Sequence, residues 1–124
     1  MALERALKEI SLPASGDLST YQYRGVALNS GGSVIISAGS VSPVFGVLQN
    51  KPSGAGQAAR VAISGITKHL SGGSIAVGDA VKTDAAGLGL VTTTAGNTIL
   101  GRAVSNEASA SGLIYELQIM PSNY

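Results

Sequence analysis

The 124-residue chain has no cysteine, no tryptophan and a single phenylalanine. The lack of cysteine excludes disulfides, thiolate metal sites and thiol catalysis. Charged side chains make up only 12% of the residues, and the net charge of +1 is too balanced for a protein that binds nucleic acid by neutralising phosphates. Little charge combined with 44% hydrophobic residues favours a surface that partly contacts another protein over an ordinary surface with few charges.

Long hydrophobic runs are also missing. No segment approaches the roughly 20 apolar residues that a membrane-spanning helix needs. Residues 1–10 carry both acidic and basic side chains and lack the apolar segment of a secretory signal. We therefore expect one soluble domain, made in a cytoplasm, with neither a membrane nor a nucleic acid as its partner.

What the chain does contain is a glycine-punctuated β pattern that occurs twice. Residues 45–63 and 100–119 each begin with a hydrophobic–Gly pair and continue through an Asn and a Gly to an alternating hydrophobic segment. The two stretches align with one inserted residue before Asn106. Each predicts a short strand, a loop of small residues and a longer strand. This pattern is typical of a rigid structural or binding protein.

The remainder of the chain favours strands as well. From Tyr21 onward, short β-branched runs alternate with Gly, Pro, Asn and Asp turns. About seven or eight short strands with at most one helix predict an all-β fold, a small antiparallel barrel or sandwich. Phe45 is the aromatic residue best placed for the core. Alternation suggests that Tyr115 faces away from the core, beside its neighbour Ile114.

Residues 2–10 predict a short amphipathic helix. Leu3, Leu7 and Ile10 fall at i, i+4 and i+7, which places them on one helical face. Such a helix is marginal alone, so it either caps its own core or forms an arm that docks on a neighbouring subunit. We expect residues 1–20 to form this N-terminal arm and residues 21–124 to form the β domain.

Catalytic constellations are absent from the sequence. His69 is the one histidine, and its place just before the turn 71–74 favours a solvated turn-edge residue over a catalytic base. Asp79 and Asp84 lie in turn sequences that already explain them. Gly54-Ala55-Gly56 has no Gly-Lys-Ser/Thr continuation and precedes a strand. We expect no enzyme activity, no metal and no cofactor.

Two isolated arginines lie on predicted strands. Arg60 and Arg102 are either ordinary exposed residues or donors to the backbone of a neighbouring subunit.

Several of these segments, taken in order, resemble the bacteriophage capsid cement (decoration) proteins. The segments are Ala59–Ile66, Ile75–Val81 followed by Asp84–Gly87, Gly101–Val104, and Ala108–Leu117. The resemblance spans roughly residues 25–120 and implies a small β-barrel or β-tulip. It also implies a virion protein on the capsid exterior, commonly a homotrimer, that binds the major capsid protein, bridges its subunits and stabilises the mature head. Leu3–Ile10 departs from the family, because it favours a helix over an extended arm.

The resemblance leaves one alternative open: another virion structural or binding module, such as a head fibre base or a tail component. Tyr and Arg are frequent interface anchors, and the arm offers apolar contacts. The residues expected at a capsid or subunit interface are Leu3, Leu7, Ile10, Tyr21, Tyr23, Arg24, Arg60 and Arg102.

Overall fold

A computed structural model describes residues 5–37, 44–105 and 108–123, and every regular element in them is a β-strand. The strands are β1 (Arg5–Pro13), β2 (Gly25–Leu28), β3 (Val34–Ile36), β4 (Gly46–Leu48), β5 (Ala58–Leu70), β6 (Ala80–Thr83), β7 (Gly89–Val91), β8 (Thr98–Ala103) and β9 (Ile114–Asn123). All neighbouring strands pair antiparallel, in the order β3-β2-β4-β5-β9-β8-β6-β7, with β1 added on β5. The predicted all-β, barrel-like class is confirmed.

The helix predicted over residues 2–10 is wrong for the described part of that segment. Arg5–Pro13 is a strand that pairs with β5, and its register shifts twice between Arg5 and Glu9. Ala6 has a φ of 50° there. Such a bulge adds a residue to one strand, so Leu7 and Ile10, three positions apart, are both partly buried. A bulged strand thus satisfies the spacing that suggested a helix. Leu3 lies outside the described residues.

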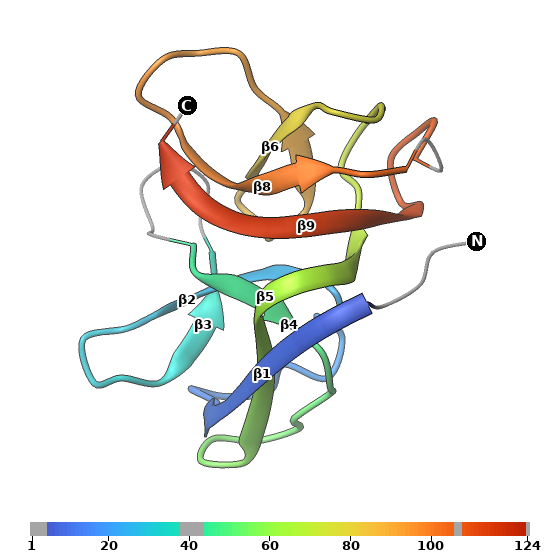
Figure 1. The fold of residues 1–124 in the computed structure, drawn as a ribbon. Helices are drawn as coiled ribbons and strands as arrows, with labels where there is room; N and C mark the ends of the chain where they lie inside the picture. The colour runs from blue at the N-terminus through green and yellow to red at the C-terminus, as the bar shows by residue number, and fades with distance from the viewer. Residues whose placement is uncertain (1–4, 38–43, 106–107, 124) are drawn as a thin grey trace.

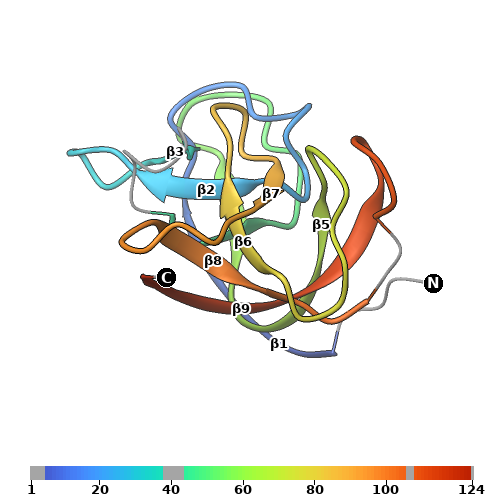
Figure 2. The same ribbon diagram turned by 90° about the horizontal axis from the view of Figure 1, so that it is seen from above.

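The curled sheet forms two lobes joined by β5, its longest strand (Figure 1). One lobe holds β1 to β4, and the other holds β6 to β9 (Figures 1 and 2). The fold has two buried apolar clusters, and the second extends into the first lobe through Val44, Val47 and Ala62. Val26, Val34, Leu48 and Val61 are central to the first cluster. The second cluster includes Val81, Leu100, Tyr115 and Leu117.

Two aromatic predictions have opposite outcomes. Phe45 is partly buried and packs against the cluster of the first lobe, as expected of a core aromatic. Tyr115 is fully buried, so its placement on the face away from the core is wrong. The neighbour Ile114, at the start of β9, is the half-exposed residue of the pair. Ile114 and Tyr115 do differ in burial, as alternation predicts, but alternation could not say which of the two faces the core.

The two lobes are copies of one five-strand unit. In the first unit, β2 pairs with β3 and β4, and in the second, β6 pairs with β7 and β8. The registers match residue for residue. Val26 lies opposite Ile36 and Gly46, as Val81 lies opposite Val91 and Gly101, and the spacing along the chain is the same. The remaining strand pair of the first unit is β1 with the early part of β5. Its equivalent in the second unit is the late part of β5 with β9.

Equivalent turns of the two units share one hydrogen-bonding pattern. The side chain of Asn29 accepts two backbone N–H bonds in the turn 29–33, from Gly31 (3.0 Å) and Ser33 (2.9 Å). Asp84 accepts the equivalent bonds in the turn 84–88, at 2.8 and 3.0 Å. Gly32 and Gly87 supply the positive φ, 81° and 77°, that both turns require. The fold is therefore an internal duplication that extends well beyond the two stretches visible in the sequence.

The duplication also corrects one detail of the sequence alignment. The backbone N–H of Arg60 donates to Asn50 Oδ1 (2.9 Å), and at the equivalent place Glu116 N–H donates to Ser105 Oγ (3.0 Å). Ser105 thus takes the role of Asn50, and the inserted residue lies after it. Asn106 itself lies outside the described residues.

Candidate interaction surface

No concave site for a small ligand is found. The described residues enclose no pocket, and no group of three or more His, Cys, Asp or Glu side chains lies together within residues 5–37, 44–105 and 108–123. The same part of the chain has no helix that is long and apolar enough to cross a membrane.

The prediction of a solvated His69 is wrong. His69 lies near the end of β5 and is fully buried. Its Nδ1 is 2.6 Å from the Tyr115 hydroxyl, and its Nε2 is 3.3 Å from the carbonyl oxygen of Gly87. Burial lowers the pKa of His69 to about 4 and raises the pKa of Tyr115 well above its usual value. A buried, neutral imidazole with both nitrogens engaged is a structural group of the second unit.

Asp79 and Asp84 act in turns, as predicted. Asp79 Oδ2 accepts a 2.8 Å hydrogen bond from the backbone N–H of Ala76, and Asp84 holds the turn 84–88.

Tyr21 and Arg24, two of the predicted interface residues, lie together. The Arg24 guanidinium is 5.0 Å from the centre of the Tyr21 ring, and its Nη1 donates to the carbonyl oxygen of Ala86 (3.2 Å). Both side chains are half-buried. Arg24 therefore connects the first unit to a turn of the second, so part of its surface is already used inside the chain.

Tyr23 precedes Arg24 in the chain and has partners of its own. It has a φ of 65°, where its counterpart Gly78 has 87°. The ammonium of Lys68 is 5.7 Å from the centre of its ring. The Tyr23 carbonyl oxygen accepts a 2.9 Å bond from Leu70 N–H. A tyrosine in the left-handed region costs roughly 1–2 kcal/mol, which the contacts of its ring and carbonyl offset.

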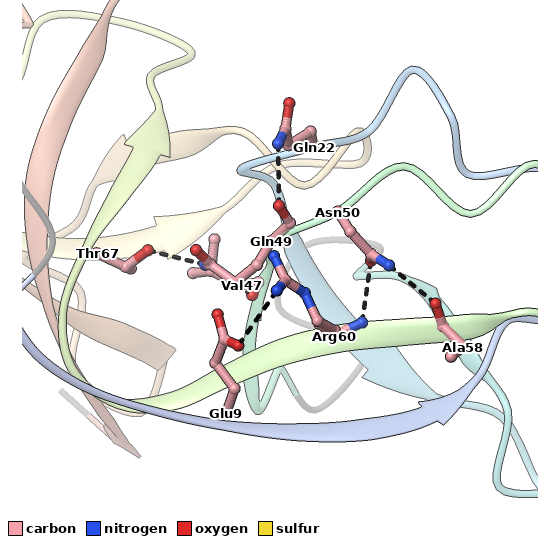
Figure 3. A network of polar contacts seen from close by, with 8 residues as sticks. All are labelled: Glu9, Gln22, Val47, Gln49, Asn50, Ala58, Arg60 and Thr67. Atoms are coloured by element: carbon pink, nitrogen blue, oxygen red, sulfur yellow. Dashed lines mark hydrogen bonds and ion pairs between the residues drawn. The ribbon is translucent and has the colours of Figure 1, made fainter.

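Arg60 lies on the exposed face of β5, beside β1 (Figure 3). Its guanidinium is 3.9 Å from Glu9 Oε1, and the side chain is 53% exposed. The Asn50 side chain accepts a hydrogen bond from the Arg60 backbone N–H (2.9 Å) and donates one to the carbonyl oxygen of Ala58 (2.9 Å). The rest of the network in Figure 3 is internal, because Gln49 is buried and donates to Thr67 Oγ1 (2.8 Å). Arg60 is thus the exposed member of an ordered polar group.

Arg102 lies on β8 of the second unit. It is exposed, and its Nη1 donates to the carbonyl oxygen of Gly78 (3.0 Å). Leu7 and Ile10 pack against different core clusters. The structure therefore brings Tyr21 and Arg24 together, Tyr23 contacts Lys68, and Arg60 and Arg102 lie on separate strands.

Sequence reasoning missed a set of exposed apolar side chains. They are Leu28, Val77, Val91, Leu113 and Met120, each between 38% and 55% exposed. In a chain with so few charges, single exposed apolar residues are ordinary, and no local pattern marks them. Only comparison of the two units shows which of them have covered counterparts.

The units meet through turn 84–88. Gly25 N–H donates to the Gly87 carbonyl oxygen (2.8 Å), and Ser37 Oγ lies 2.9 Å from Thr83 Oγ1. A methyl group on Gly87 would lie 2.7 Å from the carbonyl oxygen of Gly25. This close, buried contact joins the two units in addition to the shared strand β5.

Comparisons with known proteins agree with this description. No curated protein matches the sequence. Among solved structures, the chain is similar to the crystal structure of the head fibre gp8.5 N base of bacteriophage phi29, with a TM-score of 0.71 and 20% identity. The match covers 95% of this chain and 98% of that one, and at this identity it shows a shared fold.

The sequence profile of phage cement proteins matches residues 14–117, which is most of the chain and both units. Its members are structural proteins of the virion on the capsid exterior, and the family is not one of enzymes. The predicted class is thereby confirmed: this chain belongs to the phage cement protein family.

Proposed function

We propose that this protein binds the outside of the mature phage head, contacts the major capsid protein, bridges neighbouring capsid subunits and stabilises the shell. The observation that carries the proposal is the family match over residues 14–117. The two-unit β body supports it, because its sheet of described strands offers extended surfaces for contacts with other proteins.

The physical argument for stabilisation is mass action. A protein that binds the assembled lattice and not its separated subunits shifts the equilibrium toward the assembled shell. We further propose that the protein acts as a homotrimer. Three linked contacts raise the effective affinity far above that of one contact, so the modest surface of a small domain suffices.

Specific residues are proposed for these contacts. The proposed arm is residues 1–20 and the proposed body is 21–124. Strand β1 of the arm pairs with β5 of the body, so Leu7 and Ile10 contribute the apolar atoms that their own core leaves exposed. Tyr21, Tyr23 and Arg24 offer a half-buried group of aromatic and cationic atoms. Arg60 and Arg102 present exposed guanidinium groups whose positions are held by bonds to their own unit, which suits them to polar contacts at the rim of an interface.

The test is co-sedimentation of the purified chain with mature, undecorated heads of its own phage, with procapsids as the control particle. Saturable binding to mature heads at a fixed ratio to the major capsid protein is the expected result. Absence of binding to both particles would overturn the proposal.

A second experiment tests the arm. Deleting residues 1–12 removes most of β1, so folding of the shortened chain must first be verified by its thermal melting curve. A folded deletion variant is expected to bind mature heads more weakly. Unchanged binding would remove the arm from the interface. Arg60→Ala and Arg102→Ala test the body separately, and melting curves verify that both variants fold, as expected for exposed side chains.

An alternative function is the base of a head fibre or a tail component. The similarity to the head fibre base of phage phi29 favours it. The two functions differ in stoichiometry and location, because a tail component would bind heads at one vertex only. Binding at a few copies per head would support a tail component, and binding at many copies would argue against it.

A further inference from the structure

One row of side chains crosses four paired strands on the outside of the second unit. Arg5 of β1 lies opposite Ile66 of β5, Ile66 lies opposite Gln118 of β9, and Gln118 lies opposite Arg102 of β8. These strands can be followed in Figure 1 from β1 through β5 and β9 to β8. Directly opposite residues of paired strands point to the same face of a sheet. The residues on either side of Gln118 are buried in the second cluster, so the row points away from the core.

A second, shorter row lies beside the first. Lys68 of β5 lies opposite Glu116 of β9, and each is two residues from a member of the first row on its own strand, so they share that face. Arg5 Nη2 donates to Glu116 Oε1 at 2.8 Å, which shows that the Arg5 side chain points to the same side. We call this surface the outer face, and its residues are Arg5, Ile66, Lys68, Arg102, Glu116 and Gln118.

The equivalent surface of the first unit is covered by the chain itself. Val47 of β4 lies opposite Ala62 of β5. The equivalent pair of the second unit is Arg102 opposite Gln118. Val47 and Ala62 are fully buried in the second cluster, whereas Arg102 and Gln118 are exposed. The covered copy of this surface is therefore apolar, and the uncovered copy carries long polar side chains.

The outer face concentrates positive charge. It holds three cationic side chains, Arg5, Lys68 and Arg102, and one carboxylate, Glu116. The whole chain has a net charge of only +1, so the remainder of the molecule has no excess of positive charge. A cationic surface on a chain with so few charges favours a partner of opposite charge.

Contacts within the chain hold these cations in place. The Lys68 ammonium is 5.7 Å from the centre of the Tyr23 ring, and Arg102 Nη1 donates to the carbonyl oxygen of Gly78 at 3.0 Å. A guanidinium has five N–H donors, so one such bond leaves donors for a carboxylate of a partner. Side chains that are ordered in advance lose less conformational entropy on binding.

We propose that the outer face docks on an acidic protein surface of the mature head, where Arg5, Lys68 and Arg102 pair with carboxylates of the partner. The inference rests on the proposed function and names the face that contacts the shell. Charge complementarity gives the partner its chemistry.

The composition of the face favours a protein partner over a nucleic acid. Ile66 is half-buried, and Met120, two residues beyond Gln118 on β9, is 42% exposed. Apolar atoms thus lie among the cations, as they do at contacts between proteins. Three cations beside a carboxylate neutralise few phosphates, and phosphate neutralisation supplies most of the affinity for nucleic acid.

Matched charge substitutions test the outer face. Gln118→Glu places a negative charge at its centre. Gln57→Glu places the same charge outside it, at an exposed residue in the loop before β5, and retains the oxygen that accepts a bond from Ser53 N–H. The two variants have the same net charge, so they differ only in where the charge lies. Melting curves verify that both fold.

Binding to mature, undecorated heads is measured by co-sedimentation over a series of salt concentrations. We expect Gln118→Glu to bind about tenfold more weakly than wild type at low salt, because it repels the acidic partner surface. The difference should shrink as salt screens the charges. Gln57→Glu should bind like wild type. Equal binding of the two variants, or wild-type binding that does not depend on salt, would overturn the inference.

Gln118→Lys tests the chemistry of the partner. A water-soluble carbodiimide joins an amine to a carboxylate that is in direct contact with it. We expect this variant to give more covalent product with the major capsid protein than wild type gives, and more than Gln57→Lys gives. No excess of this product would contradict an acidic partner surface.

Other occupants of the face give different results. If Gln118→Glu lowered the mass of a wild-type multimer in light scattering, the face would be a contact between copies of this chain. If wild type bound short duplex DNA as tightly as heads, the face would be a nucleic-acid site. Either result would overturn the inference.

The two proposals are distinguished by the wild-type control. If wild type binds heads and Gln118→Glu binds them equally well, the outer-face inference fails and the cement function stands. If wild type does not bind heads, the cement function itself fails, and the inference that rests on it fails with it.

Discussion

The two units keep the same backbone and differ in what they bury. In the second unit His69 lies opposite Tyr115 across β5 and β9, whereas Leu12 lies opposite Ala59 at the equivalent place in the first. One unit therefore has a hydrogen-bonded polar pair where the other has apolar side chains. The turns and close strand contacts, in contrast, are the same in both. The comparison teaches that this fold is specified by backbone geometry, while the core side chains are free to diverge.

The largest effect is expected at the glycines where strands approach each other most closely. A methyl group on Gly101 would collide with the carbonyl oxygen of Gln118, and one on Gly46 with that of Ala62. Gly101→Ala should lower the free energy of unfolding by about 3 kcal/mol, and Gly46→Ala by a similar amount. Urea denaturation measures both.

The control for this pair is Gly16→Ala, since no atom lies within 4 Å of a methyl group at Gly16. It should change stability by less than about 0.5 kcal/mol. If Gly101→Ala were equally harmless, the close approach of β8 and β9 would be wrong.

The buried histidine should make the second unit sensitive to acid. The pKa of His69 is about 4 in the folded chain and roughly 6.5 in the unfolded chain. The unfolded state therefore takes up the proton first as the pH falls. Stability is fully present above pH of about 6.5 and declines toward pH of about 4, by about 3 kcal/mol in total. Urea denaturation at a series of pH values measures the decline.

The double variant His69→Leu with Tyr115→Phe copies the apolar character of the first unit. It should remove most of the pH dependence between these limits, while the effects of the carboxyl groups remain. A decline of the same size in the double variant would show that His69 is not its source.

A smaller loss of stability is expected where a side chain, instead of a neighbouring strand, accepts a backbone N–H bond. Asn50→Ala removes the acceptor for Arg60 N–H and the donor to Ala58, whereas Ser105→Ala removes only the acceptor for Glu116 N–H. We expect losses of about 1.5 kcal/mol and about 0.7 kcal/mol, respectively, because a net hydrogen bond contributes about 1 kcal/mol. Thermal and urea unfolding compare the two; the reverse order would contradict the equivalence of these residues.

The smallest effect is expected from ion pairs along β1. Glu9 and Arg60 are 3.9 Å apart and exposed, so Glu9→Gln should change stability by less than about 0.5 kcal/mol. Arg5 donates to Glu116 at 2.8 Å, and that carboxylate side chain is 8% exposed, so Arg5→Gln should cost about 1 kcal/mol. Double-mutant cycles measure the coupling energy of each pair. An Arg5–Glu116 coupling energy no larger than that of Glu9 and Arg60 would show that the Arg5 bond is absent in solution.

The fold class was predictable because Gly, Pro and β-branched residues alternate along most of the chain. The glycines of the two repeated stretches marked the close contacts of β4 with β5 and of β8 with β9. The rest of the duplication was hidden, because its equivalent positions hold different residues, such as Asn29 and Asp84, or Tyr23 and Gly78. Their equivalence lies in φ angles and hydrogen bonds, which composition does not reveal.

The candidate site was less predictable than the fold. A helix was expected around Leu7 because a bulge at Ala6 gives a strand the spacing of a helical face. His69 was expected in water because β5 extends to Leu70, beyond the alternation visible in the sequence. Leu28 is exposed whereas its counterpart Thr83 is buried, and only the comparison of the two units shows this difference. Each of these depends on contacts between distant segments, which local patterns do not contain.

The most direct test of the central claim is a cryo-electron microscopy reconstruction of mature, undecorated heads saturated with the purified chain. The cement function predicts added density of two-lobed subunits on the outer surface, repeated over the contacts between neighbouring major capsid proteins. A saturated sample with no added density on the shell, or with density confined to the tail vertex, would contradict it.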